Sequence, residues 1–279
     1  MKQARVMTAA LVLTGIVSGC ASMGPGGGEA QIYRLELDQA LNGKGTLVVH
    51  AQHSGIGIVA AFGESPKFNQ AAHDVDTSGL SISGGRIAGK IKVTVNPDLW
   101  VPKSGKSVMC VYTIDAETEK GKVTGTYEGT YSMAEAKGTV SGKAMNASAP
   151  GAVRFRLQVD NAISGGGKKD AWLRRALISF KMDDGKVAAV GVKCPESATK
   201  MWMAKVTKAK LAFDGARLTG VLVANIQGDG FKSGQYMFEL DGKVIGDRAG
   251  GRCTVSFDGK KTGDRTFIGS VEPVVVPAE

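Results

Sequence analysis

The sequence predicts an all-β protein made of two tandem, duplicated antiparallel domains, each a β-sandwich or a barrel-like structure. Three observations support this fold class. Blocks in the first half of the chain recur in the same order in the second half. Apolar and polar residues alternate along several stretches, which is the pattern of half-buried strands. The chain also holds 39 glycines, many inside these stretches, as expected where strands bulge or bend sharply.

The repeat is clearest in a few pairs of segments. Residues 32–38 and 39–45 resemble residues 154–160 and 161–167, residues 80–89 resemble residues 211–220, and residues 112–115 resemble residues 238–241. These pairs keep their order and nearly keep their spacing, which indicates a tandem duplication with small changes in loop length. The alternative is a chance similarity between glycine-rich strands.

Strand signals dominate each copy, and helix signals are nearly missing. Residues 86–95 alternate from Lys90 onward, and residues 122–131 carry alternating threonine and tyrosine. In the second copy, residues 173–182 and 186–192 flank Asp183-Asp184-Gly185, which predicts a hairpin turn with glycine at a position of positive φ. The corresponding turn in the first copy is expected at Ser54-Gly55.

These patterns divide the chain into four parts. Residues 1–19 form a leader, residues 20–30 a glycine-rich tether, residues 31–146 the first β domain and residues 152–273 the second. The junction between the domains is expected at residues 146–151. The alternative organisation is one pseudo-symmetric β structure in which the two copies share sheets.

The leader has the regions of a secretory signal. Lys2 and Arg5 are basic, residues 6–17 are apolar, and Ser18-Gly19 are small residues that precede Cys20. The apolar run is too short for a spanning helix. The step from small residues to cysteine resembles the lipobox of bacterial lipoproteins, and this resemblance covers residues 1–20 only.

That resemblance implies a signal peptide at residues 1–19 and a mature protein that begins with lipidated Cys20. It implies a location in the cell envelope with the membrane as partner through the acyl chains. Ala21 stands where aspartate is associated with retention at the inner membrane, so the outer membrane is favoured. The alternative is an ordinary secretory signal that happens to carry a cysteine near its cleavage site.

The formal net charge is +9, and the basic residues are scattered without long runs. Such scatter is typical of a solvated surface, although a basic face can attract anionic glycans, lipid headgroups or teichoic-type polymers. Aromatic residues make up only 6% of the chain. Together with the expected export, this argues against a nucleic-acid partner.

No catalytic or cofactor motif is convincing, and no cofactor is expected. Residues 55–60 match a dinucleotide-binding pattern but lack the strand–turn–helix context that it needs. No G-x-S-x-G elbow is present. The histidines His50, His53 and His73 lie in the first copy only, and their spacing does not predict a metal site, so we expect surface or half-buried side chains.

Several charged residues are duplicated. Asp38 and Asp160, like Asp115 and Asp241, lie where strands are expected to end, which favours a role in turns over catalysis. Arg86 and Arg217 each open a strand, and we expect them to form structural hydrogen bonds or ion pairs. The sequence still leaves open a glycosidase, which needs only two suitably spaced carboxylates.

Aromatic and cysteine side chains supply the remaining candidates. Trp100 and Trp202 are candidate platforms for stacking on a sugar ring, whereas Trp172 is expected in a core. Cys194 and Cys253 are the favoured pair if a disulfide forms, because both lie in the second copy. The alternative is that these two residues and Cys110 are small buried thiols.

The sequence therefore favours a lipid-anchored, non-catalytic binding module of the cell envelope, with a glycan or another envelope component as ligand. One alternative is a structural or assembly lipoprotein with a protein partner. The other is a hydrolase acting on polysaccharide.

Overall fold

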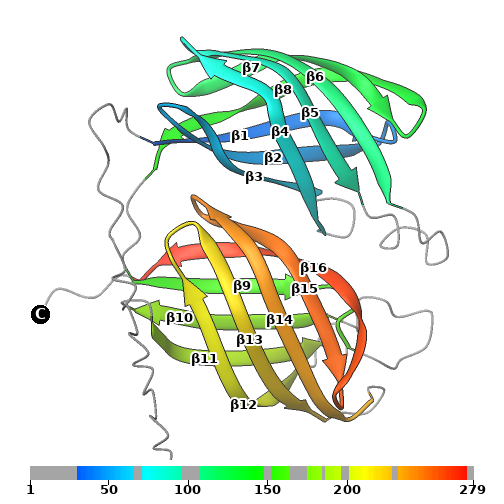
Figure 1. Ribbon diagram of the computed structural model, residues 1–279, viewed down its shortest axis with the longest axis vertical. Coiled ribbons are helices and arrows are strands. Elements are labelled where there is room, and N and C mark those ends of the chain that lie inside the picture. The colour runs from blue at the N-terminus through cyan, green and yellow to red at the C-terminus, as the bar shows by residue number, and fades with distance from the viewer. Residues whose placement is uncertain are drawn as a thin grey trace, which may run out of the picture.

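The computed structural model describes residues 30–65, 71–95, 107–147, 152–163, 175–183, 186–195, 201–227 and 232–274. These residues form sixteen strands and no helix (Figure 1). None of their segments is therefore a helix long and apolar enough to cross a membrane. The first eight strands are β1 (Gln31–Leu41), β2 (Gly45–Ser54), β3 (Gly57–Ser65), β4 (Ala71–Ser83), β5 (Arg86–Val95), β6 (Val108–Glu119), β7 (Lys122–Tyr131) and β8 (Ala134–Asn146).

The other eight strands repeat this pattern in the second half. They are β9 (Val153–Val159), β10 (Ala176–Asp183), β11 (Lys186–Pro195), β12 (Met201–Phe213), β13 (Arg217–Ile226), β14 (Gly234–Ile245), β15 (Arg248–Phe257) and β16 (Lys260–Pro273). The expected strands at residues 86–95 and 122–131 match β5 and β7. The predicted hairpin after Asp183 also forms, because Asp183 pairs with Lys186 across the turn.

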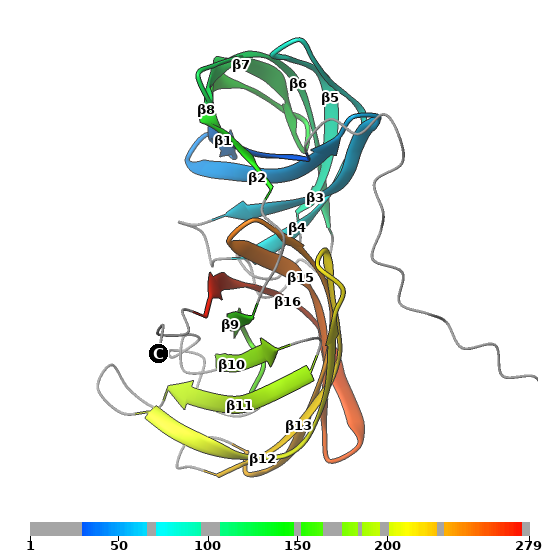
Figure 2. The same cartoon turned by 90° about the vertical axis from the view of Figure 1, so that its left-hand side faces the viewer.

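Each half closes into its own barrel. Strands β1 to β8 pair in chain order and β8 returns to pair with β1, and strands β9 to β16 do the same. We call these barrel 1 and barrel 2. Figure 2 looks nearly along the axis of barrel 1, whose strands close into a ring. The two tandem β domains are confirmed, and the alternative of shared sheets is excluded because every strand pairs within its own barrel.

Glycines at corresponding positions reveal the duplication in three dimensions. Gly89 on β5 and Gly220 on β13 both have positive φ, 127° and 138°. A Cβ at either position would lie 2.1 Å from a carbonyl oxygen of the paired strand, that of Gly79 or of Lys210. Only glycine fits at such a close approach. The matching constraint in both barrels supports a common origin for the two copies.

The two cores lie inside the barrels. Alternate residues of each strand point inward, so β5 buries Ile87, Ile91 and Val93 while the lysines between them face solvent. In barrel 1 the buried Tyr112 hydroxyl donates to the Ala40 carbonyl at 2.6 Å. This bond satisfies a polar group that burial would otherwise penalise. The core of barrel 2 contains a separate cluster around Phe155, Tyr236 and Phe238.

The duplicated arginines form ion pairs, as expected. The Arg86 Nη2 atom lies 3.1 Å from Asp115 Oδ1, and the Arg217 Nη2 atom lies 3.1 Å from Asp241 Oδ2. Asp115 pairs with Ala88 and Asp241 pairs with Thr219, so each arginine reaches diagonally to an aspartate of the next strand. Both pairs are well exposed, and they occupy corresponding positions in the two copies.

The cysteines of the barrels are free thiols, and all three are buried. The disulfide proposed between Cys194 and Cys253 is therefore corrected. Cys194 lies on β11 and Cys253 lies on β15, which are not neighbours in the barrel. Burial raises the pKa of each of these thiols to about 12. The alternative reading of Cys110, Cys194 and Cys253 as buried hydrophobes holds.

The chain passes between barrels where barrel 1 begins and ends. The Ala147 amide donates to the Ala30 carbonyl at 2.8 Å, so the entry to β1 and the exit from β8 are bonded together. Ala147 also packs against a small apolar cluster of Ile32, Phe62 and Ile245. This cluster joins residues of both barrels, so the entry and exit of barrel 1 lie at the contact between the barrels.

Candidate ligand cleft between the barrels

The barrels touch through the outer face of β1 to β3 and the start of β4, which packs against β14 to β16 (Figure 2). Phe62 is the central apolar side chain of this contact and is 4% exposed. A Cβ on Gly250 of β15 would lie 2.7 Å from the Phe62 ring. Glycine at this position therefore lets the ring lie directly against the backbone of barrel 2.

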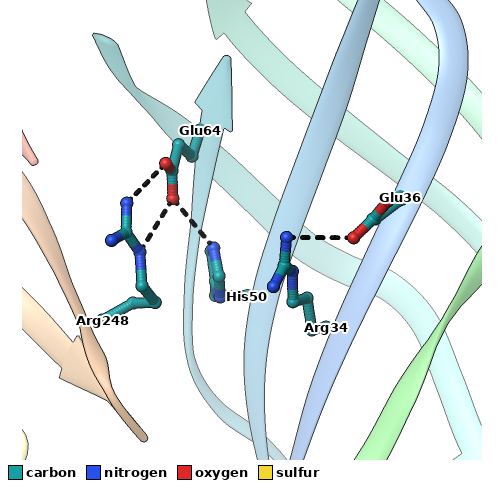
Figure 3. A network of polar contacts seen from close by, with 5 residues as sticks. All are labelled: Arg34, Glu36, His50, Glu64 and Arg248. Carbon is teal, nitrogen blue, oxygen red and sulfur yellow. Dashed lines mark hydrogen bonds and ion pairs between the residues drawn. The ribbon is translucent and has the colours of Figure 1, made fainter. Parts of the chain in front are cut away.

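A buried carboxylate connects the two barrels (Figure 3). Glu64 Oε1 accepts from Arg248 Nη2 at 2.5 Å, and Glu64 Oε2 accepts from Arg248 Nε at 3.2 Å. His50 Nε2 lies 3.2 Å from the same Oε2 atom, and the His50 ring stacks on Phe62. Burial raises the pKa of Glu64, but the hydrogen bond with His50 and the charge of Arg248 outweigh it, so the pKa is lowered.

Two further polar contacts cross between the barrels. The Arg252 guanidinium of β15 bonds to the Asp74 carboxylate of β4. The Lys243 ammonium of β14 donates to the Ala61 carbonyl of β3 at 2.7 Å. Both lie beside the Phe62 contact, on the side away from Glu64. They fix the relative position of the surfaces that border a cleft.

The cleft between the barrels has a volume of about 760 Å³. Barrel 1 contributes Val59 to Phe62, His73 and Asp74, and barrel 2 contributes charged side chains of β13 to β16 around Gly250 and Gly251. This volume is within the range of small-molecule sites in proteins. Gly250 and Gly251 have no side chains, so they leave the backbone of barrel 2 accessible from the cleft.

Charged groups in the cleft already have partners. Arg217 pairs with Asp241, Arg252 pairs with Asp74, and the Asp264 carboxylate accepts from Thr254 and Lys261. The hydrogen bonds with Lys261 and Thr254 lower the pKa of Asp264. The cleft thus presents oriented donors and acceptors, and these groups are held in place before any ligand arrives.

His73 and Ser65 form a buried pair near this cleft. The His73 Nε2 atom lies 3.0 Å from Ser65 Oγ, while its Nδ1 atom has no hydrogen-bond partner among the described residues. Burial lowers the pKa of His73 to about 4. A nucleophilic serine needs a histidine oriented by a third group, usually a carboxylate. The neighbouring Asp74 carboxylate bonds to Arg252 instead, so no described carboxylate orients His73 for such a triad with Ser65.

The residues singled out in the sequence do not meet at one site. Cys20 and Trp100 lie outside the described residues, as does Trp172. The backbone of Trp202 pairs with Cys194 on β11, but its side chain is not described. Among the residues that are described, no group of three or more metal-binding side chains lies close together.

Two of the three histidines differ from the expected surface or half-buried positions, whereas His53 is half-buried as expected. His50 and His73 are both 3% exposed, because His50 lies under barrel 2 and His73 lies beneath the cleft. Sequence reasoning also missed Glu64, Lys243, Arg248 and Arg252. The one available signal was Glu64 itself, a single acid at the end of the apolar segment 58–62.

Comparisons with known proteins give little further information. No family model matches the chain, and no curated protein matches it. One solved structure, of a "putative AttH" from Nitrosomonas europaea, is 8% identical, covers 86% of this chain and 91% of that chain, and superimposes with a TM-score of 0.20. A TM-score of this size carries no argument about the fold or the function of this chain.

Proposed function

We propose that this chain is a non-catalytic, lipid-anchored binding protein of the cell envelope, and that the cleft between the barrels takes a polar, hydroxyl-rich ligand such as a glycan. The observation that carries this proposal is the lining of the cleft. Both barrels contribute to it, and its charged side chains are held by partners in fixed orientations.

The pairing of charges favours an uncharged ligand over an ion. Arg217 and Arg252 each bond to an aspartate, whereas Lys243 and Arg265 donate to backbone carbonyls. The lining holds four cations and the three carboxylates of Asp74, Asp241 and Asp264, so little net charge is left for a charged ligand. Guanidinium and carboxylate groups that are already oriented can still donate to and accept from hydroxyl groups. Preorganised groups of this kind lose little freedom when a ligand binds. A sugar offers many hydroxyls of both kinds.

The same lining argues against a hydrolase. A glycosidase needs one carboxylic acid with a raised pKa to protonate the leaving group. In this cleft, hydrogen bonds lower the pKa of Asp264, and ion pairs occupy Asp74 and Asp241. His73 is uncharged at neutral pH and has no orienting carboxylate. These features support binding without catalysis.

The envelope location rests on the leader. We propose that Cys20 carries the acyl chains and that the outer membrane is the host membrane. Mass analysis of the protein and of a Cys20→Ala variant tests this: we expect a lipid adduct on the parent only, and release of the variant into the soluble fraction. An unmodified parent protein would remove the anchor from the proposal.

A screen of the soluble Cys20→Ala protein against a glycan array, followed by calorimetry, tests the binding function. The chain supplies a matched pair of variants. Arg217 lines the cleft, whereas Arg86 makes the corresponding ion pair of barrel 1 and is not part of the cleft lining. We expect Arg217→Ala to weaken glycan binding about tenfold and Arg86→Ala to leave it unchanged.

The outcomes separate the proposed functions. Equal losses in both variants would place the ligand elsewhere, and no bound glycan would favour the structural lipoprotein with a protein partner. Trp100→Ala and Trp202→Ala belong to the same series, because we propose these aromatic rings as stacking platforms. If either tryptophan variant lost glycan affinity while Arg217→Ala kept it, the ligand would bind at that tryptophan and not in the cleft.

A further inference from the structure

Barrel 2 has a face that corresponds to the docking face of barrel 1. Strand pairing defines the correspondence: β1, β2 and β3 of barrel 1 match β9, β10 and β11 of barrel 2. The residues matched in this way are Ile32 with Arg154, Val48 with Leu177, His50 with Ser179, Phe62 with Gly191, and Glu64 with Lys193. In barrel 1 this face is covered by the hairpin of β14 and β15.

The two faces have diverged in chemistry. Ile32 and Phe62 form the apolar contact between the barrels, but arginine and glycine stand at their positions in barrel 2. Glu64, which binds Arg248 across the barrel contact, corresponds to Lys193. Arg154 and Lys193 are exposed, and within the described residues neither has an ion-pair partner.

A groove of about 700 Å³ lies on this face of barrel 2. It contains four cations and one carboxylate, namely Arg154, Arg156, Lys193, Arg248 and Glu64. The carboxylate of Glu64 is neutralised by Arg248, and Arg156 is paired with Glu272 of β16 at 3.2 Å. Arg154 and Lys193 are therefore the cations of the groove that have no ion-pair partner among the described residues. The groove lies on the Glu64 side of the barrel contact, and the cleft lies on the other side.

Hydroxyl groups stand beside the cations. Arg156 on β9 pairs with Ser179 of β10 on one side and with Ser270 of β16 on the other. Leu177 and Ile268 flank Gln158 in the next row of the same face. The groove therefore combines guanidinium and ammonium groups with hydroxyl, amide and aliphatic side chains. Guanidinium groups with nearby hydroxyls are suited to carboxylate, sulfate and phosphate oxygens.

We propose that this groove is a second binding site, distinct from the cleft, for an anionic oligosaccharide. Acidic groups would bind Arg154 and Lys193, with Arg156 held beside them by Glu272. The serine hydroxyls and Gln158 would bond to sugar hydroxyls. The site goes beyond the proposed function, because it takes a charged ligand on another surface.

A second copy of the chain is a poorer occupant. The hairpin of barrel 1 that corresponds to β14–β15 is β6–β7, and its Lys122 takes the position of Arg248. If it docked as the β14–β15 hairpin does, Lys122 would meet Lys193. Like charges at the centre of an interface are unfavourable.

Calorimetry with the full mature chain in its soluble Cys20→Ala form tests the proposal. The probes are a heparin-derived hexasaccharide and its fully desulfated, N-acetylated counterpart. We expect the sulfated probe to bind, the desulfated probe to bind at least about tenfold more weakly, and added salt to weaken binding.

Two double variants with equal charge change separate the groove from general attraction. Arg154→Glu with Lys193→Glu changes the groove, and Lys90→Glu with Lys122→Glu changes exposed lysines of barrel 1. We expect the groove variant to bind the sulfated probe at least about tenfold more weakly and the control variant to keep nearly all its affinity. Circular dichroism establishes that both variants are folded.

Three results would overturn the proposal: no binding of the sulfated probe, equal affinity for the desulfated probe, or equal losses in the two double variants. Binding of phosphatidylglycerol vesicles but not of the hexasaccharide would also overturn it and identify a lipid surface instead. Arg217→Ala keeps the groove intact and should bind the sulfated probe normally. Arg217→Ala therefore tests ligand binding in the cleft, and Arg154→Glu with Lys193→Glu tests ligand binding in the groove.

Discussion

Glu64 of barrel 1 and Arg248 of barrel 2 form a two-point ion pair across the contact between the barrels. The Glu64 side chain is 8% exposed and the Arg248 side chain is 25% exposed. Among the described residues, a second ion pair crosses the contact, between Asp74 and Arg252, and it is well exposed. Two inter-barrel ion pairs in different surroundings allow a direct comparison.

Removing the Glu64 charge should cost much more stability than removing that of Asp74. In Glu64→Gln, the Arg248 charge loses its partner in a largely buried position, so we expect a loss of about 2 kcal/mol in the free energy of unfolding. In Asp74→Asn the loss should be below about 1 kcal/mol, because water screens the exposed pair. Urea unfolding at neutral pH measures both. Equal losses would contradict the assigned difference in burial.

Stability should fall with acid because of His73. Its pKa is about 4 in the folded chain and 6.5 in the unfolded chain, so the unfolded state binds more protons between these values. The contribution is complete above pH 6.5 and is lost as the pH falls toward 4, by on the order of 3 kcal/mol. The lowered pKa of Glu64 acts in the same direction at lower pH.

Unfolding free energies measured from pH 7 to pH 4 test this dependence. We expect a shallower slope in His73→Gln, because the group that gains a proton on unfolding is removed. If the free energy of unfolding of His73→Gln changed with pH as steeply as that of the parent protein, other groups would cause the acid sensitivity.

The contact between Phe62 and Gly250 should not tolerate an added methyl group. The Cβ of Gly250→Ala would overlap the Phe62 ring, and we expect a loss of about 1 to 3 kcal/mol. The double variant with Phe62→Leu should recover part of that loss. Gly191→Ala at the corresponding open face should be nearly neutral, because its Cβ would meet only the Ser179 hydroxyl, at 3.3 Å. Thermal melts of the three variants measure these effects.

The duplicated ion pairs should contribute equally and weakly to stability. The side chains of Arg86 and Asp115 are 64% and 63% exposed, and those of Arg217 and Asp241 are both 61% exposed. Arg86→Ala and Arg217→Ala should therefore each lower the free energy of unfolding by less than about 1 kcal/mol. A large loss in one variant alone would mean that the two pairs have separate structural roles.

The buried thiols should be inert in the folded chain. Burial raises the pKa of Cys194 and Cys253 to about 12 and also raises that of Cys110, so thiolate is scarce at neutral pH. Ellman's reagent should react with these three residues only after denaturation, under non-reducing conditions. A single remaining thiol in the denatured chain would instead indicate the disulfide that the structure lacks.

The duplication and the strands were predictable because they depend on local patterns. Arg86 and Arg217 each open a strand as expected, and their diagonal pairs follow from the repetition of arginine and aspartate. The expected position of Asp115 and Asp241 at strand ends was wrong, because both lie inside β6 and β14, where the arginine of the neighbouring strand reaches them. Closure into barrels was not predictable, because it depends on pairing between β1 and β8, and no local pattern distinguishes it from a sandwich. The choice between barrel and sandwich therefore stayed open in the sequence.

The candidate site was not predictable from the sequence for a related reason. Ala61 to Ser65 of β3 are buried on both faces, one in barrel 1 and one against barrel 2, so alternation disappears there. Glu64 then resembles an ordinary strand-end acid. Its partner, Arg248, lies more than half the chain away, and only the packing of two finished barrels brings them together.

The hydrogen bond between Ala147 and Ala30 determines where a membrane anchor would act on the molecule. Ala147 packs against the apolar cluster shared by both barrels. A tether that leaves at Ala30 therefore starts at the contact between the barrels and not at the far end of one barrel. A chain anchored at the contact between its barrels can lie with both barrels beside the membrane. The cleft and the groove lie on opposite sides of this contact, and both would then stay close to the membrane surface.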